Sequence, residues 1–345
     1  SPHAYLLLDG AKQSTTLYLA HQSAQQAAGE GEILSPENAD RCVKLTGVDQ
    51  VQGIELLARA LERVGTIYTP MRQGEGPTTS QDTLWRAQQE VYSDPWDGRP
   101  DRMRHFVRLL RDRCPAAELV DLAPVLNELR AVKDETEIAL LRKAGKLTAL
   151  GVIQAMRATQ PGVMEYQLDA VMRYHYLVNG ARDVGYRAII AGGPNAWYGH
   201  YGANNCELQD GDLVLFDCAP DYHYYTSDIG RMWPVNGRYS PLQRELYGFI
   251  VKYHKVLLRL IRPGATDAQI QQEAAAEMKE VVDRTNWSKE IYEASARRSL
   301  EFPYHMSHPV GMAVHDVGHY RGKPIPVGTV LTLDPMMWIP EERLY

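Results

Sequence analysis

The stretch DGDLVLFD at residues 210–217 is matched later in the chain by VGTVLTLD at residues 327–334. In each stretch a glycine turn precedes a short, largely apolar segment that ends in an aspartate. A second matching pair, QPGVME at 160–165 and RPGATD at 262–267, places a Pro-Gly turn between two helical patterns. Because both pairs occur in the same order, the sequence predicts two related halves in this part of the chain.

Two aspartates in the first half are expected to lie close together. Asp217 ends its apolar segment, and Asp228 follows a second strand-like stretch, YHYYTS at 222–227. Residues 219–221 (APD) can turn the chain, so the two stretches are predicted to pair as a hairpin. Two like charges held together favour a metal ion between them. The plain alternative is a turn-capping Asp217 and an unrelated surface Asp228.

Histidines cluster in the second half, where HMSHPVGMAVHD at 305–316 holds three of the chain's 11 histidines. Imidazole is a common ligand for transition metals and transfers protons near neutral pH. Asp334, which the repeat matches to Asp217, would add a carboxylate from the second half. Carboxylates with one imidazole suit Mn²⁺, Co²⁺ or Zn²⁺ at a two-metal centre better than a thiolate zinc site.

The repeat also predicts a counterpart of Asp228 beyond Asp334. An equal step along the chain reaches Tyr345, the last residue, so we expect that carboxylate to follow immediately and the C-terminal end to be incomplete. Glu341 and Glu342 are nearer, but they follow Pro340 and are interpreted as a solvated turn.

The first part of the chain has a different pattern. Short apolar runs at 4–10 and 64–68 alternate with helical patterns such as 53–64 and 102–113, which predicts an α/β domain. A long amphipathic pattern begins near residue 122. We therefore expect two domains, residues 1–121 and residues 122–345.

Composition narrows the function classes. The 345 residues are 44% hydrophobic and carry a net charge of -6, which argues against nucleic-acid or membrane partners. No apolar run is long enough to cross a membrane, and no signal peptide is visible. The four cysteines are scattered, with no CxxC pair, and are interpreted as free thiols in a reducing compartment. We expect a cytoplasmic location.

These motifs resemble those of the proline-specific branch of the pita-bread metallopeptidases, the aminopeptidase P and prolidase family. Residues 215–231 resemble the family's paired-aspartate hairpin, and residues 305–316 resemble its histidine-rich segment. Gly199-His200-Tyr201, followed by Asn204, resembles its other substrate histidine. Residues 1–121 resemble, less specifically, a creatinase-type N-terminal domain. The resemblance implies an α/β N-terminal domain followed by an α+β pita-bread domain with an internal pseudo-twofold repeat.

The resemblance also implies roles for individual residues. The implied metal ligands are Asp217, Asp228, His308 and Asp334. The implied catalytic residues are Asp334, His200 and His315, and the implied substrate contacts are His200, His305 and His315.

Two departures from the family pattern are visible. The family usually has Glu-Pro-Gly where this chain has Asp334-Pro335-Met336, so the side chain that binds metal and moves the proton is one methylene shorter. The family's last glutamate ligand has no match within the 345 residues.

The implied activity is metal-dependent hydrolysis of the Xaa-Pro bond at the N-terminus of peptides or dipeptides, through a hydroxide that bridges two divalent ions. The ions would be Mn²⁺, or alternatively Zn²⁺ or Co²⁺. The partner would be a peptide with proline at its second position, and analogy suggests a homodimer. The alternatives are a catalytically weak or inactive peptide-binding module, a creatinase-like C–N hydrolase and a methionine aminopeptidase-like enzyme.

Overall fold

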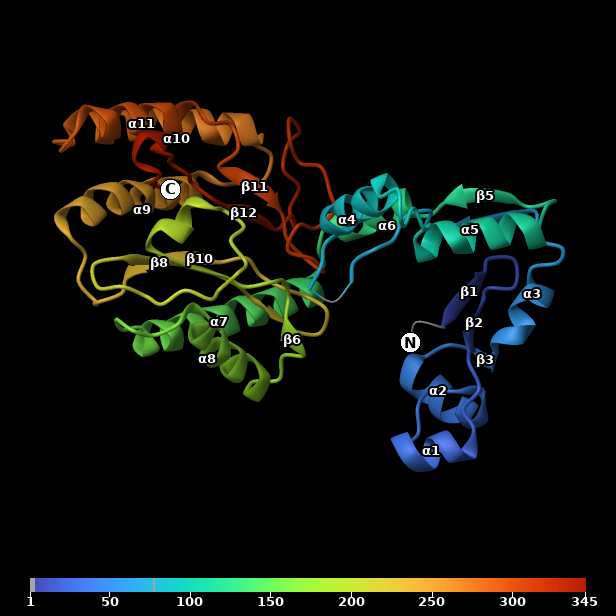
Figure 1. The fold of residues 1–345 in the computed structure, drawn as a ribbon. Coiled ribbons are helices and arrows are strands. Elements are labelled where there is room, and N and C mark those ends of the chain that lie inside the picture. The colour runs from blue at the N-terminus through green and yellow to red at the C-terminus, as the bar shows by residue number, and fades with distance from the viewer. Residues whose placement is uncertain (1–3, 77) are drawn as a thin grey trace. The chain divides into compact units, whose positions relative to one another are not determined.

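The structure is a computed structural model that describes residues 4–76 and 78–345, and the chain divides into two compact units (Figure 1). Residues up to 71 and residues 100–122 form the first unit, whereas residues 72–99 and 123–345 form the second. The sequence predicted one boundary near Asp121. The structure has a boundary there too, but residues 72–99, which precede it, belong to the second unit. Two ion pairs account for this: Glu75 lies 2.7 Å from Arg130, and Asp82 lies 3.0 Å from His315.

The first unit is an α/β assembly, as its alternating pattern predicts. Strand β1 (Tyr5–Asp9) pairs antiparallel with β2 (Ser14–Leu19), which pairs in parallel with β3 (Gln50–Gly53). Strands β4 (Thr66–Thr69) and β5 (Glu118–Asp121) form a separate parallel pair. Its helices are α1 (Ala24–Glu30), α2 (Ala39–Thr46), α3 (Leu57–Ala60) and α5 (Arg102–Arg113). The helix expected over residues 53–64 is thus shortened to α3 and a 3₁₀ turn before it.

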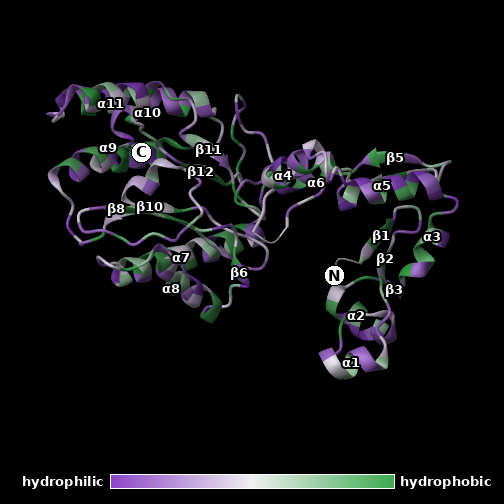
Figure 2. Ribbon diagram, viewed as in Figure 1, coloured by the Kyte–Doolittle hydropathy of each residue, from purple (hydrophilic) through white to green (hydrophobic). Residues whose placement is uncertain are grey.

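The second unit packs helices against short strands. Its helices are α4 (Gln81–Ser93), α6 (Ala123–Ala131), α7 (Glu135–Ala158), α8 (Glu165–Val178), α9 (Pro241–Leu260), α10 (Asp267–Arg284) and α11 (Glu290–Glu301). Capping boxes begin three of them, at Asp134, Ser240 and Thr266. Hydrophobic and hydrophilic residues alternate along these helices (Figure 2), as expected where one face packs inward. No helix in the described ranges is long and apolar enough to span a membrane.

The central sheet of the second unit has the strand order β10–β8–β7. Strand β8 (Leu213–Asp217) pairs antiparallel with β7 (Ile189–Gly192) and with β10 (Gly230–Pro234). The predicted hairpin therefore exists, but its second strand is β10 and not residues 222–227. Residues 222–225 instead close a tight turn, in which His223 and Tyr224 adopt left-handed backbone angles of 51° and 69° in φ.

Further strands complete the unit. Strand β6 (Asp183–Val184) pairs with β9 (Pro220–Asp221). Two of the three residues predicted to form only a turn, 219–221, therefore belong to a short strand. Strand β11 (Met306–Pro309) pairs antiparallel with β12 (Leu331–Leu333). Each pairing joins segments that are well separated in the sequence, so it positions side chains that the sequence alone does not bring together.

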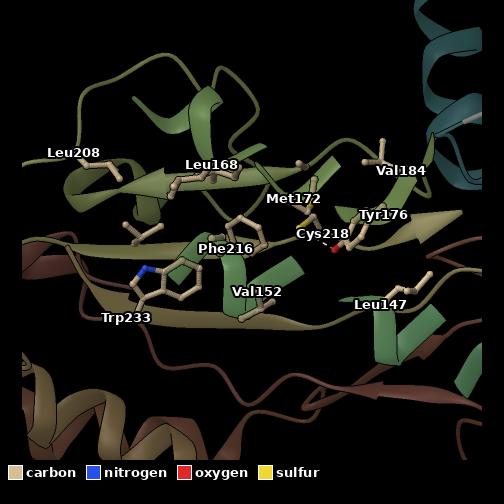
Figure 3. Close-up of a cluster of buried hydrophobic side chains, with 14 of the residues drawn as sticks. Leu147, Val152, Leu168, Met172, Tyr176, Val184, Leu208, Phe216, Cys218 and Trp233 are labelled. Atoms are coloured by element: carbon tan, nitrogen blue, oxygen red, sulfur yellow. Dashed lines mark hydrogen bonds between the residues drawn. The ribbon is translucent and has the colours of Figure 1, made fainter. Parts of the chain in front are cut away.

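The first half of the second unit is built on a core between α7, α8 and the central sheet (Figure 3). Phe216 of β8 and Trp233 of β10 lie side by side with ring centroids 5.3 Å apart. The Tyr176 hydroxyl and the Cys218 thiol, both completely buried, lie 3.7 Å apart. This packing holds β8 rigidly next to the point where Asp217 leaves it. All four cysteines are free thiols.

The two Pro-Gly turns make matching hydrogen bonds. The Gly162 amide donates to the Leu208 carbonyl at 2.9 Å, and the Gly264 amide donates to the Ile325 carbonyl at 2.9 Å. Leu208 precedes β8, and Ile325 precedes β12, by similar intervals. Each turn thereby ties the start of a helix to the segment leading into an aspartate-bearing strand.

Candidate metal centre

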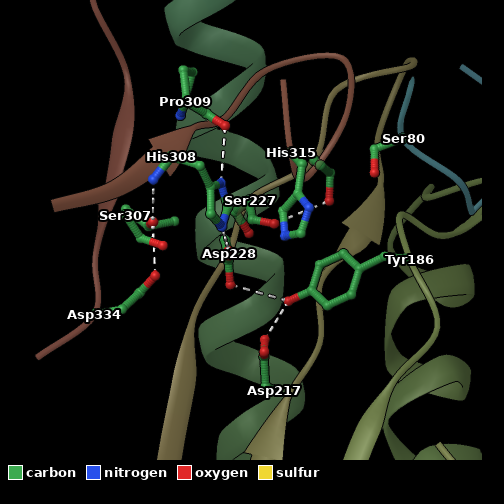
Figure 4. A network of polar contacts seen from close by, with 12 residues as sticks. Ser80, Tyr186, Asp217, Ser227, Asp228, Ser307, His308, Pro309, His315 and Asp334 are labelled. Carbon is green, nitrogen blue, oxygen red and sulfur yellow. Dashed lines mark hydrogen bonds and ion pairs between the residues drawn. The ribbon is translucent and has the colours of Figure 1, made fainter. Parts of the chain in front are cut away.

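The carboxylates of Asp217 and Asp228 lie at the end of the β8–β10 hairpin. Asp217 is the last residue of β8, and its register partner is Gly230 at the start of β10. Asp228 precedes that strand by two residues, so the chain reversal brings it back beside Asp217. The hydrophobic core under β8 fixes the strand, and the two acidic side chains emerge at its end (Figure 4).

His308 and Asp334 come from the second half. His308 lies on β11, and Asp334 directly follows β12, where its amide donates to the His305 carbonyl at 2.7 Å. The His308 Nδ1 lies 3.1 Å from the Pro309 carbonyl oxygen, which only accepts, so Nδ1 carries the proton. Nε2 therefore faces the cluster, 3.2 Å from Asp228 Oδ2. When protonated it donates to that carboxylate, and when deprotonated it would offer its lone pair to a metal ion.

Asp228, His308 and Asp334 together form a group that could hold a metal ion. One ligand atom from each lies within 4.8 Å of the others. Among the described residues, no lysine or arginine forms an ion pair with Asp217, Asp228 or Asp334. Carboxylate oxygens with one imidazole are ligands that suit Mn²⁺ or Zn²⁺. The donor set therefore fits a divalent cation.

Electrostatics support this fit. Desolvation, together with the charge of Asp228, raises the pKa of Asp217 well above its usual value. Desolvation and the same neighbouring charge raise the pKa of Asp334, although His308 opposes the shift. Burial lowers the pKa of His308, but the hydrogen bond and charge of Asp228 outweigh it, so the pKa is raised. Negative charge thus accumulates here, and a divalent cation would relieve it.

Tyr186 is a residue of this site that sequence reasoning missed. Its hydroxyl donates to Asp217 Oδ1 at 2.5 Å and lies 3.4 Å from Asp228 Oδ1, so it connects the two carboxylates (Figure 4). Burial and the nearby aspartates raise its pKa well above 10.0, which keeps the donating proton in place. Tyr186 lies between β6 and β7 with no local pattern around it, so no sequence signal would have singled it out.

Two further histidines extend from the cluster in a row. The ring of His315 lies edge-on to the ring of His308, with centroids 4.3 Å apart, and the ring of His200 lies 6.1 Å from that of His315. Although the His200 side chain keeps an exposed surface, partial desolvation by neighbouring atoms, followed by the charge of His315, lowers its pKa. The structure therefore brings two of the three predicted substrate histidines next to the candidate metal ligands.

His305 does not join them. Its side chain is completely buried, and its ring packs against Tyr253 at 4.6 Å between centroids. Its Nε2 donates to the Ser299 carbonyl at 2.7 Å, while its Nδ1 accepts from the Met336 amide at 3.2 Å. Because backbone groups occupy both ring nitrogens, the expected substrate contact from His305 is replaced by a structural role.

Asp82, at the start of α4, is the second residue that sequence reasoning missed. Its Oδ2 lies 3.0 Å from Nδ1 of His315. Burial opposes ionisation, but hydrogen bonds from Ser80 and His315 lower the pKa of Asp82 to about 2. The local sequence around Asp82 indicates only a helix start. Its partner lies far away in the sequence, which leaves no other signal.

Comparison with known proteins places this geometry in a family. The family model "Metallopeptidase family M24" matches residues 139–344, which hold all four candidate ligands. The Xaa-Pro aminopeptidase of Escherichia coli is 36% identical over 230 residues, 65% of this chain and 52% of the relative. That of Haemophilus influenzae is 35% identical over 233 residues, 66% of this chain and 54% of the relative. The chain thus spans about half the length of these curated relatives.

Solved structures agree. A zinc-substituted aminopeptidase P from Escherichia coli, in complex with product, superposes with a TM-score of 0.76 at 28% identity. The match covers 99% of this chain and 78% of that structure. The mixed α/β architecture is accordingly that of the pita-bread fold. The family match, the shared fold and the acidic cluster with its histidine agree, and the chain belongs to metallopeptidase family M24.

Proposed function

We propose that this chain is the catalytic part of a peptidase that hydrolyses the Xaa-Pro bond at the N-terminus of peptides and depends on two divalent metal ions. One observation carries the proposal: Asp228, His308 and Asp334, drawn from both halves of the second unit, place ligand atoms within 4.8 Å of one another. Asp217 lies beside them through the shared Tyr186 hydroxyl. Family membership and the named Xaa-Pro aminopeptidase relatives support the substrate class.

The metal ions would be held by Asp217, Asp228, His308 and Asp334. Bound divalent ions lower the pKa of water and polarise a carbonyl, which is the chemistry that hydrolysis of an amide needs. Mn²⁺ is our first candidate, with Zn²⁺ and Co²⁺ as alternatives. Asp334 would accept the proton of the attacking water and return it to the leaving nitrogen. The Thr332 hydroxyl, 2.9 Å from Asp334 Oδ2, would orient that carboxylate.

The histidine row would bind the peptide. His200 and His315 would donate hydrogen bonds to the carbonyl that is attacked and to the charge that develops on it. Proline would be selected by its ring, which fixes φ and removes the amide hydrogen. Asp82 accepts from Nδ1 of His315, so Nε2 of the doubly protonated ring would be the atom that donates to the substrate.

Four further expectations remain proposals. We propose that the second unit consists of two related halves, supported by the matching Pro-Gly turns. We propose that the first unit is a separate, creatinase-type domain. A homodimer and a cytoplasmic location also stay predictions.

The test is hydrolysis by purified protein stripped of metal and then supplied with Mn²⁺, Zn²⁺ or Co²⁺. The substrates are Ala-Pro-Ala, Ala-Ala-Ala and the dipeptide Ala-Pro. Asp228→Asn serves as the inactive control, and we expect it to lose at least about 10³-fold in rate, since metal assistance contributes several kcal/mol.

Cleavage that requires metal, prefers proline and disappears in the variant would support the proposal. Equal cleavage of Ala-Pro-Ala and Ala-Ala-Ala would contradict the substrate class. Metal binding without cleavage would favour an inactive peptide-binding module. The Asp334 side chain, one methylene shorter than the family's glutamate, would then explain the missing activity.

A further inference from the structure

The loop between β7 and β8 carries His200, and a single carboxylate lies beneath it. The His200 side chain is exposed, near the middle of residues 193–207. Glu165, the first residue of α8, is completely buried under this loop. Its role is not explained by the metal cluster, which it does not join.

Four hydrogen-bond donors surround the Glu165 carboxylate, and all come from this loop and its entry. Oε1 accepts from the Gly192 amide at 2.8 Å and from Asn195 Nδ2 at 2.9 Å. Oε2 accepts from the Tyr201 hydroxyl at 2.9 Å and from the Cys206 amide at 3.0 Å. The donors therefore lie on both sides of His200 in the sequence, and one of them is its immediate neighbour.

This arrangement makes the carboxylate and the loop depend on each other. Among the described residues, no lysine, arginine or histidine forms an ion pair with Glu165. A buried carboxylate without a counter-ion is stable only if hydrogen bonds replace its hydration, and bonds to an ionised acceptor are the strong ones. Burial, followed by hydrogen bonds with Cys206 and Glu165, raises the pKa of Tyr201, so its hydroxyl keeps its proton.

Close packing restricts the loop further at its entry. A Cβ atom added at Gly192 would lie 2.6 Å from Cδ2 of the buried Leu208, so a larger residue at this position would displace that side chain. The Glu165 amide in turn donates to the Cys206 carbonyl at 2.9 Å. Entry and exit of the loop are thus fixed on the same side chain.

We propose that Glu165 is a positioning residue, which holds the loop so that His200 faces the substrate. The proposal rests on the proposed function for the role of His200, but the anchoring of the loop can be tested without activity. Glu165 acts through Tyr201 and the loop backbone and does not itself touch the reacting atoms.

The first test is hydrogen exchange in Glu165→Gln, with Glu207→Gln as the matched control. Glutamine would direct an NH₂ group at two of the four donors, so the loop must move. Glu207 is exposed on the same loop and undergoes the same change of charge. We expect the amides of Gly192 and Cys206 to exchange at least about tenfold faster in Glu165→Gln only. Unchanged exchange would overturn the proposal, whether or not the protein cleaves peptides.

The second test is a double-mutant cycle with His200→Ala. We expect Glu165→Gln to lower kcat/KM on Ala-Pro-Ala by about 10²-fold, the effect of a catalytic group displaced by about 1 Å. In the His200→Ala background it should cause no further loss, because its effect passes through His200. An equal loss in both backgrounds would overturn the positioning role and indicate general destabilisation.

Tyr201→Phe is the milder variant, should Glu165→Gln fail to fold. It removes one of the four donors and leaves the charge in place. We expect a smaller loss of kcat/KM, again cancelled by His200→Ala, with Mn²⁺ affinity unchanged. A loss that persists in the His200→Ala background would count against the proposal.

Discussion

The loop that carries His200 and the segment that carries His315 are held in place by different interactions. Beneath the first lies Glu165, whose carboxylate accepts four hydrogen bonds and forms no ion pair with any described residue. Beside the second lies Asp316, which pairs with Arg130 at 2.5 Å and with Lys133 at 3.1 Å. Asp82 adds a contact to His315 itself at 3.0 Å.

The two regions can be compared because each contains an acidic residue at the start of a helix. Glu165 begins α8, and Asp267 begins α10, each after a Pro-Gly turn. Asp267 accepts from the Gly322 amide at 2.8 Å, in the segment that follows His315. In the first half the acidic residue supports the loop through uncharged donors. In the second half, charged partners from α6, α4 and the helix connection provide much of the support.

The largest effect is expected from breaking the buried ion pairs of the second half. Asp316→Asn would leave the Lys133 ammonium, whose side chain is 1% exposed, without its anion. Removing one partner of a buried pair typically costs about 3–5 kcal/mol. We expect a decrease of this size in the free energy of unfolding, measured by urea denaturation.

Asp283→Asn is the control for this change. Asp283 pairs with Lys279 and Arg297 on the surface, where such pairs contribute about 0–1 kcal/mol. Equal destabilisation by the two variants would contradict the distinction between buried and surface anchoring.

A smaller effect is expected from Asp82→Asn, which removes the charge that faces His315. Partners of this kind orient a functional histidine, and their loss typically costs about 10–100-fold. We expect kcat/KM to fall by about 10-fold, the lower end of this range, because both side chains are partly exposed and salt screens the pair. The decrease should shrink at high ionic strength. Glu90→Gln, on the exposed face of α4, should leave kcat/KM unchanged.

The smallest effect concerns the pH dependence of the metal-free protein. The folded-state pKa values of Asp217 and Asp334 are raised above 3.8, so the folded state binds more protons than the unfolded state. Their contribution to stability is therefore lost as the pH rises from about 4 through the raised values. The raised pKa of His308 acts in the same direction at higher pH.

Asp228→Asn reduces this contribution, because the charge of Asp228 adds to desolvation in raising both neighbouring pKa values. We expect urea unfolding in EDTA to give a flatter pH dependence between pH 4 and 8 for the variant than for the wild type. The lowered pKa of Asp82, about 2, acts only in more acidic solution and in the opposite sense. Identical slopes would contradict the electrostatic account of the cluster.

The sequence predicts the metal ligands because each belongs to a local pattern. Asp217 and Asp334 end apolar strands, and strand pairing brings them to the histidine segment. The choice of His308 among its three histidines came from the family resemblance. The second strand of the hairpin was predicted at residues 222–227, whereas it is β10 (Gly230–Pro234). Residues 222–225 form a turn in which two non-glycine residues take left-handed angles, and no strand-like pattern reveals that.

The residues that hold the site side chains and the His200 loop were not predictable in the same way. The contacts of Tyr186 with Asp217, of Asp82 with His315 and of Glu165 with Gly192 span 31, 233 and 27 residues. Their roles follow from tertiary structure alone. His305 shows that a local motif can also mislead. It lies inside the histidine cluster, but backbone groups bind both of its ring nitrogens.

The most direct test of the central claim is to locate the metal. Crystals of the protein grown with Mn²⁺ should be measured at a wavelength where manganese scatters anomalously. We expect anomalous density among Asp217, Asp228, His308 and Asp334, and its loss in Asp228→Asn. Ordered Mn²⁺ found elsewhere, with no density at this cluster in the wild type, would contradict the assignment of the metal centre.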